Sequence, residues 1–161
     1  MEVTSWRRPR RDYRGDNRTE NRRKFDRAMS ARFPRPLDKT PFRTLVDGVF
    51  QDAIRLNRDF FYTGSQHCDD VCIPAGFTSD GASVPRALWR IYPPFGKYLE
   101  AAVIHDWFCV LGHKGESPID SVAAAKVFRE AMLACGVNKW RRNKMYWAVR
   151  IGGPKFKSHK L

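Results

Sequence analysis

A change in the pattern of apolar residues near residue 80 constrains the fold of this chain more than any other feature. Before it, short segments are rich in β-branched and aromatic residues, as strands usually are: Phe42–Phe50, Ile54–Thr63 and Val71–Thr78. After it, apolar residues recur at helical spacing. Because the strands precede the helices, we predict an α+β fold. It has a small antiparallel β-meander, a cluster of three to four helices and an extended basic N-terminal arm.

Helical segments are predicted at residues 86–92, 98–111, 118–135 and 139–151. The third has the strongest start signal, with Ser117 as the N-cap and Pro118 in the first turn. Gly112 and Gly136 are expected to end the second and third helices, because glycine suits the position that follows a helix. Asn138 is expected to cap the last helix.

The last predicted helix mixes aromatic and basic residues and allows two interpretations. A packing helix would turn apolar residues inward, namely Trp140, Trp147, Ala148 and Ile151. It would leave Lys139, Arg142 and Lys144 in water. A nucleic-acid-binding helix would instead place basic side chains along a phosphate backbone, namely Lys139, Arg141, Arg142 and Lys144. We prefer the packing interpretation, because aromatic residues at helical spacing usually belong to a core.

The net charge of +13 is concentrated at the two ends of the chain. Residues 1–43 hold 14 Lys and Arg against 6 Asp and Glu, and residues 139–161 hold 8 against none. The middle is slightly acidic, with 8 against 11. We therefore divide the chain into a basic Arg-rich extended arm at 1–43, a globular α+β domain at 44–153 and a basic C-terminal tail at 154–161. The tail is expected to be loose.

The arm has almost no apolar residues from Arg7 to Lys24, so it cannot bury enough surface to offset the entropy of ordering. Arginine predominates, and its planar guanidinium binds carboxylates or phosphates through paired hydrogen bonds. We predict that the arm binds an acidic protein surface or nucleic acid and becomes ordered on that partner. A solubilising tail is the alternative. The residues expected to bind are Arg7, Arg8, Arg10, Arg11, Arg14, Arg18, Arg22 and Arg23.

Membrane and secreted classes are not favoured by the composition. No stretch approaches the ~18 apolar residues of a spanning helix, and no apolar stretch follows the first residues as in a secretory signal. The 4 cysteines are too few and too unevenly spaced for a disulfide framework. We expect a soluble protein made in a reducing cytoplasm, with no membrane partner and no bound cofactor.

The candidates for chemistry are Asp80, on a glycine-containing turn, and the neighbours His105 and Asp106 in the second predicted helix. His105 shares a helical face with Ala101 and Phe108, so its ring is expected to point inward, where a histidine usually serves the core. Asp106 projects about 100° further round the helix. An imidazole and two carboxylates can hold a divalent metal, or the imidazole can act as a general base. These residues are therefore our catalytic candidates.

Residues Val71 to Arg86 (VCIPAGFTSDGASVPR) resemble the hallmark of domain of unknown function 1353, a family encoded by phages and bacteria. Further family marks follow in order: His105-Asp106-Trp107, residues 127–132 (VFREAM) and residues 146–152 (YWAVRIG). The resemblance spans roughly residues 44–153 and leaves out the basic arm. It implies a tailed-phage or prophage origin and no settled activity.

The sequence departs from the pattern of that family in the third predicted helix. The resemblance implies an Ala-Asp pair before the phenylalanine, whereas this chain has Ala124-Ala125, so a third acidic position near His105 is missing. Hard cations prefer carboxylate oxygens, and transition metals usually need more than one imidazole. We therefore expect Asp80 and His105 to form a hydrogen-bonded junction between the loop of the sheet and the helices.

Together these features predict a structural or accessory protein of a tailed-phage virion, in its tail, neck or baseplate. It would be made in the host bacterial cytoplasm and would dock on other virion proteins in a multi-chain assembly through its body and its arm. One alternative is a metal-dependent hydrolase of cell wall or a phosphoester, using Asp80, His105 and Asp106. A second alternative is a non-specific nucleic-acid-binding protein.

Overall fold

The structure is a computed structural model that describes residues 32–46, 49–79 and 98–159. The arm arginines predicted to bind (Arg7 to Arg23), the helix predicted at 86–92 and the candidate Asp80 lie outside the described residues. Among the described helices, none has the length and apolar character to cross a membrane.

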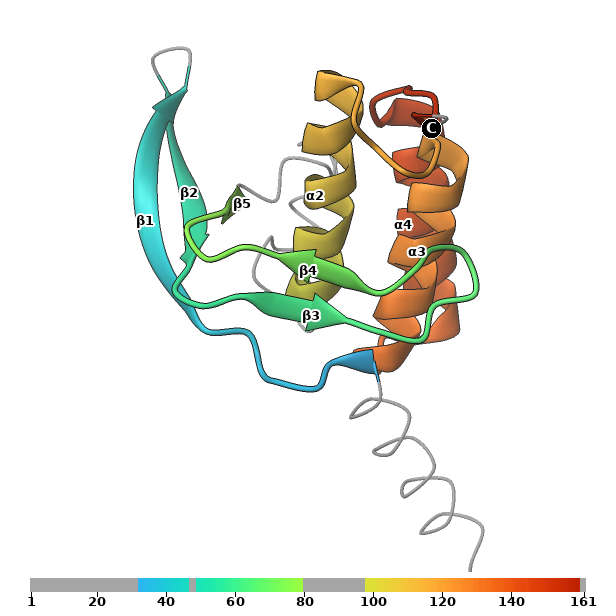
Figure 1. Cartoon of the computed structure of the whole chain (residues 1–161), viewed down its shortest axis with the longest axis horizontal. Helices are drawn as coiled ribbons and strands as arrows, with labels where there is room; N and C mark the ends of the chain where they lie inside the picture. Colours follow the sequence, from blue (N-terminus) through green and yellow to red (C-terminus); the bar gives the residue numbers. More distant parts are fainter. Residues whose placement is uncertain (1–31, 47–48, 80–97, 160–161) are drawn as a thin grey trace, which may run out of the picture.

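The strands form two small antiparallel sheets (Figure 1). In the first, β1 (Lys39–Val46) pairs with β2 (Val49–Leu56), and β2 pairs with β5 (Thr78–Ser79). In the second, β3 (Phe60–Tyr62) pairs with β4 (Val71–Ile73). Figure 1 shows the β3–β4 pair lying across the helices, with the long β1–β2 hairpin standing to one side.

The predicted strand at 54–63 is divided between β2 and β3 by a polar turn. Asn57 donates from its side chain to Asp38 Oδ1 at 2.7 Å and from its backbone to Asp38 O at 3.0 Å. Asp59 accepts from the backbone N–H of Ala75 at 2.8 Å. These side chains satisfy backbone and polar groups that a continuous strand would pair elsewhere, so the chain changes sheets here.

Three helices follow among the described residues: α2 (Leu99–Lys114), α3 (Ser121–Ala134) and α4 (Lys139–Gly152). They overlap the helices predicted at 98–111, 118–135 and 139–151, with differences at the ends of the first and the start of the second. α3 packs against both α2 and α4. The predicted α+β fold, with antiparallel strands followed by helices, is confirmed.

The ends of α3 and the start of α4 correct one prediction and confirm two. α3 is capped by Asp120, which accepts from the backbone N–H of Ala123 at 2.7 Å, and not by Ser117. The hydroxyl of Ser117 donates instead to the carbonyl of Ile119 at 2.6 Å, so it is already occupied before the helix begins. Asn138 caps α4 as predicted, and Gly136 follows α3 with a φ of 74° that favours glycine.

α2 runs past Gly112, where it was expected to end, and stops at Gly115. Gly112 has a packing role instead: a Cβ there would lie 2.3 Å from Cγ of Phe156, so the ring of Phe156 rests directly on the helix backbone. Phe156 also accepts from the N–H of Ser121 at 3.1 Å, and the N–H of His159 donates to Ser117 O at 2.6 Å. The loose tail we predicted at 154–161 is therefore wrong for its described residues.

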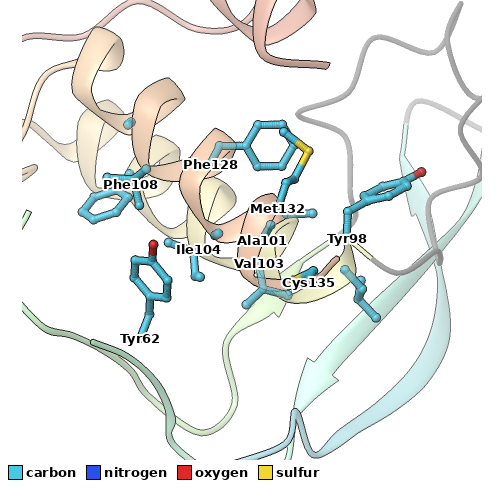
Figure 2. Packing of buried hydrophobic residues seen from close by; sticks show 14 of the residues in the cluster. Tyr62, Tyr98, Ala101, Val103, Ile104, Phe108, Phe128, Met132 and Cys135 are labelled. Atoms are coloured by element: carbon cyan, nitrogen blue, oxygen red, sulfur yellow. The ribbon is translucent and has the colours of Figure 1, made fainter. Parts of the chain in front are cut away.

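One core joins the β3–β4 pair to the helices (Figure 2). Its largest fully buried side chains include Phe60, Tyr62 and Ile73 from the strands and Ile104, Phe108, Phe128, Met132 and Met145 from the helices. Within the predicted arm, the described residue Phe33 stacks on Phe60 with ring centroids 5.7 Å apart. Residues just before β1 thus belong to the packed body.

Candidate functional site

His105 lies inside the molecule, as its position on α2 predicted. Its side chain is buried, with the residue 3% exposed, and its ring centroid lies 5.2 Å from that of Phe128 on α3. Cys109, one turn further along α2, places its Sγ 3.7 Å from Nδ1 of His105. The imidazole therefore packs against an aromatic ring and a buried thiol between the two helices.

Burial lowers the pKa of His105 to about 4, because the charged imidazolium loses its hydration in the core. At neutral pH the ring is uncharged. An effective general base has a pKa near the working pH. In this environment His105 is suited to packing and to weak hydrogen bonding more than to proton abstraction.

Asp106 is also buried, at 6% exposed, and its carboxylate accepts a hydrogen bond from the hydroxyl of Ser79. Ser79 is the last residue of β5, and Asp106 is in α2, so this bond ties the first sheet to the helices. We expected Asp80 and His105 to make such a junction. Among the described residues it is made by their neighbours, Ser79 and Asp106. We call Ser79, His105 and Asp106 the polar junction.

The position expected to carry a further carboxylate lies in the core. Ala124 and Ala125 are both buried in α3, on the turn before Phe128. Within the described part of the chain, no group of three or more His, Cys, Asp or Glu side chains is arranged to hold a metal ion. Asp80 lies outside that part, so the set of Asp80, His105 and Asp106 stays a prediction.

α4 is rotated differently from the prediction. Met145 and Val149 face the core, at 0% and 4% exposed. Trp140, Trp147 and Ile151, which we expected to point inward, are exposed to 63%, 58% and 77%. At about 100° per residue, these three side chains lie within about 40° of one another around the helix and nearly opposite Met145 and Val149. We call Trp140, Trp147 and Ile151 the aromatic stripe.

Cations flank the aromatic stripe. Lys144 places its Nζ 3.5 Å from the ring centroid of Trp140, a cation–π contact on the outer face. Lys139 and Arg141 are exposed as well, and no Asp or Glu occurs from residue 139 to the end of the chain. The outer face of α4 therefore combines flat apolar groups with positive charge.

Sequence reasoning missed a second group of cations, on α3 and before β1. Lys126 and Arg129 lie one turn apart on α3, and Arg32 reaches the same region. A sequence pattern could have predicted this group: two basic residues three apart, Lys126 with Arg129 and Lys139 with Arg142, occur on two helices joined by a short loop. Two such helices pack side by side, which brings the pairs together.

Residues 54–149 match the family described as "Protein of unknown function (DUF1353)". The chain belongs to this family. The DUF1353 region begins within β2 and ends within α4, so it contains the polar junction and both tryptophans of the aromatic stripe. The predicted resemblance is confirmed. The phage or prophage origin that it implied stays a prediction.

Two relatives of this DUF1353 protein are uncharacterized proteins of Sinorhizobium fredii (strain NBRC 101917 / NGR234). It is 34% identical to y4jT over 129 residues, which are 79% of this chain and 37% of the relative. It is 34% identical to y4iH over 80 residues, which are 48% of this chain and 31% of the relative. The matches thus span about a third of each relative. No solved structure matches this chain significantly.

Proposed function

We propose that this protein is a structural docking protein, which binds an acidic surface of a partner protein through the outer face of α4. The observation that carries the proposal is the aromatic stripe: Trp140, Trp147 and Ile151 stand in water beside Arg141 and Lys144. Tryptophan and arginine are the residues most enriched where protein interfaces gain their binding energy.

The exposed apolar side chains of α4 favour a binding partner, and the positive charge beside them favours an anionic one. Single exposed apolar residues are ordinary, but two indoles and an isoleucine exposed on the same face of one helix are typical of an interaction site. Every charged side chain of α4 is basic, so an acidic partner would gain attraction where a basic one would be repelled. The Arg-rich arm adds positive charge of the same kind.

The polar junction supports a structural role. His105 is buried and uncharged at neutral pH, and Asp106 is engaged by Ser79. A buried polar network whose members have partners fixes the relative position of the elements it joins. Here that network fixes β5 on α2, in the middle of the DUF1353 region.

We further propose that the assembly is the particle of a tailed phage, with this protein in the tail, neck or baseplate. This finer proposal rests on the family marks in the sequence. An arm that becomes ordered only on its partner lets a small protein cover a large surface, which suits a component of a multi-chain particle.

A crosslinking experiment tests the docking face. A photo-crosslinking amino acid replaces Lys144, beside the stripe, in the full-length chain, which is expressed in the host cell during particle assembly. The control carries the same group in place of Leu45, which is 60% exposed on β1. We expect crosslinks from position 144 to an acidic protein of purified particles, and few from position 45. Equal products from both positions, or products with nucleic acid alone, would contradict the proposal.

The hydrolase alternative makes a separate prediction. If Asp80, His105 and Asp106 hold a divalent ion, metal analysis of the purified protein finds it at one equivalent, and His105→Ala loses it. Retention of a full equivalent by the His105→Ala protein assigns the ion to other residues.

A further inference from the structure

A cavity of about 760 Å³ lies between α3, α4 and the chain that connects β3 to β4. Its volume falls in the range of sites that hold a ligand of nucleotide size. Leu133 and Ala134 give it an apolar wall. Its cations come from three separate parts of the chain and are Arg32, Lys126, Arg129, Lys139 and Arg142. We call this cavity the cationic pocket.

Among the described residues that line the pocket, one carries a carboxylate, and that carboxylate already has partners at one wall. Glu130 pairs with Arg32 at 2.6 Å through Oε1. Its other oxygen accepts from the hydroxyl of Ser65 at 2.7 Å and from the backbone N–H of Gln66 at 3.4 Å. Within the described residues, no carboxylate lies in ion-pair distance of the remaining cations, Lys126, Arg129, Lys139 and Arg142. The pocket therefore holds four positive charges that nothing described in the chain neutralises.

Two of these cations are held in place before any ligand binds. The guanidinium of Arg129 lies over the ring of Tyr146, 4.7 Å from its centroid. Arg142 donates from Nη1 to the carbonyl of Val137 at 3.1 Å. Burial, and repulsion by the nearby charge of Arg129, lower the pKa of Arg142. Each keeps further N–H groups for a ligand, since a guanidinium has five.

Such an arrangement is unfavourable while the pocket is empty of anions and favourable once an anion enters. We propose that the cationic pocket binds the oligophosphate group of a small molecule, such as a nucleoside triphosphate, with Arg129 and Arg142 gripping the phosphates and Leu133 contacting the organic part. A triphosphate carries about as many negative charges at neutral pH as the pocket has unpaired cations. Cations that converge from several elements suit a compact anion better than an extended strand, which needs a linear track.

The inference does not depend on the docking role of α4. The stripe points to one side of α4, while Lys139, Arg142 and Asn143 turn toward α3. If the pocket does not bind phosphate, the crosslinks expected from the docking face are unchanged. If the docking face gives no crosslinks, the phosphate binding expected of the pocket is unchanged.

Calorimetric titration of the full-length protein tests the pocket. The probes are ATP, inorganic tripolyphosphate, AMP and a single-stranded oligonucleotide. We expect saturable binding of ATP and tripolyphosphate, weaker binding of AMP, and a strong loss of affinity with added salt. In Arg129→Gln/Arg142→Gln the dissociation constant for ATP should rise by about tenfold or more, because two charge-assisted contacts are lost.

The matched control removes the same charge elsewhere. Lys155→Gln/Lys157→Gln lies outside the pocket, and its affinity for ATP should stay within about twofold of the parent. Lys126→Gln/Lys139→Gln provides a second pocket variant that touches no aromatic contact or helix-end hydrogen bond, and it should also bind ATP more weakly.

Three results would overturn the proposal. One is an equal loss of affinity in the pocket variants and in Lys155→Gln/Lys157→Gln, which reports net charge alone. Another is the absence of saturable binding for both ATP and tripolyphosphate. The third is an oligonucleotide that binds more tightly than ATP and displaces it, which assigns the pocket to nucleic acid.

Discussion

The polar junction and the aromatic stripe reverse the usual distribution of side chains. Ser79, His105 and Asp106 lie inside, where apolar residues are the rule, while Trp140 and Trp147 lie in water. The buried polar groups find partners within the chain, which is the condition for burying them at all. Lys144 lies over the ring of Trp140, the ring of Trp147 contacts that of Tyr146, and both indoles face water. The comparison teaches that the polar junction is satisfied within the chain, whereas the outer side of α4 leaves apolar side chains exposed to water.

The largest expected contrast lies within α4 itself. Met145→Ala removes a fully buried side chain and should destabilise the protein by about 2–5 kcal/mol, because a cavity replaces it. Trp147→Ala removes a larger but mostly exposed side chain, whose ring contacts that of Tyr146, and should change stability by less than about 1.5 kcal/mol. Urea unfolding of both variants measures the difference. A destabilisation by Trp147→Ala equal to that of Met145→Ala would make the stripe part of the core.

A substitution in the polar junction should have the next largest effect. Asp106→Ala should cost about 2–3 kcal/mol, since it removes a charged acceptor and leaves the hydroxyl of Ser79 buried without it. Asp106→Asn keeps an oxygen that can accept and should cost less. Thermal or urea unfolding compares the two. Additive effects of Asp106→Ala and Ser79→Ala in the double variant would show that the two side chains are not coupled.

The contact between the C-terminal segment and α2 gives a smaller effect. Gly112→Ala would push a methyl group into the ring of Phe156 and should cost about 1–3 kcal/mol, offset in part by the better helix propensity of alanine. Combining it with Phe156→Ala should remove most of the added cost. If Gly112→Ala stabilises the parent protein, the ring does not rest on α2 in solution.

The buried imidazole predicts an effect of another kind, a dependence of stability on pH. The folded pKa of His105 is about 4, against about 6.5 when unfolded, so between these values only the unfolded chain binds the proton. The contribution of the uncharged His105 to the free energy of unfolding is fully present above pH 6.5. It is lost as the pH falls toward 4, by up to about 1.4 kcal/mol per pH unit. Denaturant titrations at several pH values give the free energy of unfolding as a function of pH. Between pH 4 and 6.5 this free energy should rise more steeply with pH for the parent than for His105→Gln. Identical slopes would place His105 in water.

Much of the body could be predicted because local rules decided it. The cap at Asn138 and the stop at Gly136 depend on neighbouring residues alone, and the inward ring of His105 follows from the helical spacing of its neighbours. The cap of α3 was misplaced because Ser117 and Asp120 both satisfy the capping rules. Which of them caps depends on a carbonyl that only the folded loop brings to Ser117.

The candidate site was less predictable because its decisive contacts are tertiary. α4 carries apolar residues on two opposite faces, Met145 with Val149 and Trp140 with Trp147, and periodicity does not say which face meets α3. The smaller, flexible Met145 lies in the interior and the tryptophans lie outside, because close packing depends on shape more than on apolar area. The bond from Ser79 to Asp106 spans 27 residues, and no spacing rule reaches that far.

The ring of Phe156 on Gly112 has a consequence for how a partner can approach. It pins the chain beyond the end of α4 to α2, while Met145 and Val149 pin α4 from within. These contacts fix the rotation of α4 about its axis. The two indoles therefore project at a fixed separation of about 10 Å along the helix. A partner protein therefore needs two pockets at that separation, so shape complementarity restricts the choice of partner more than charge does.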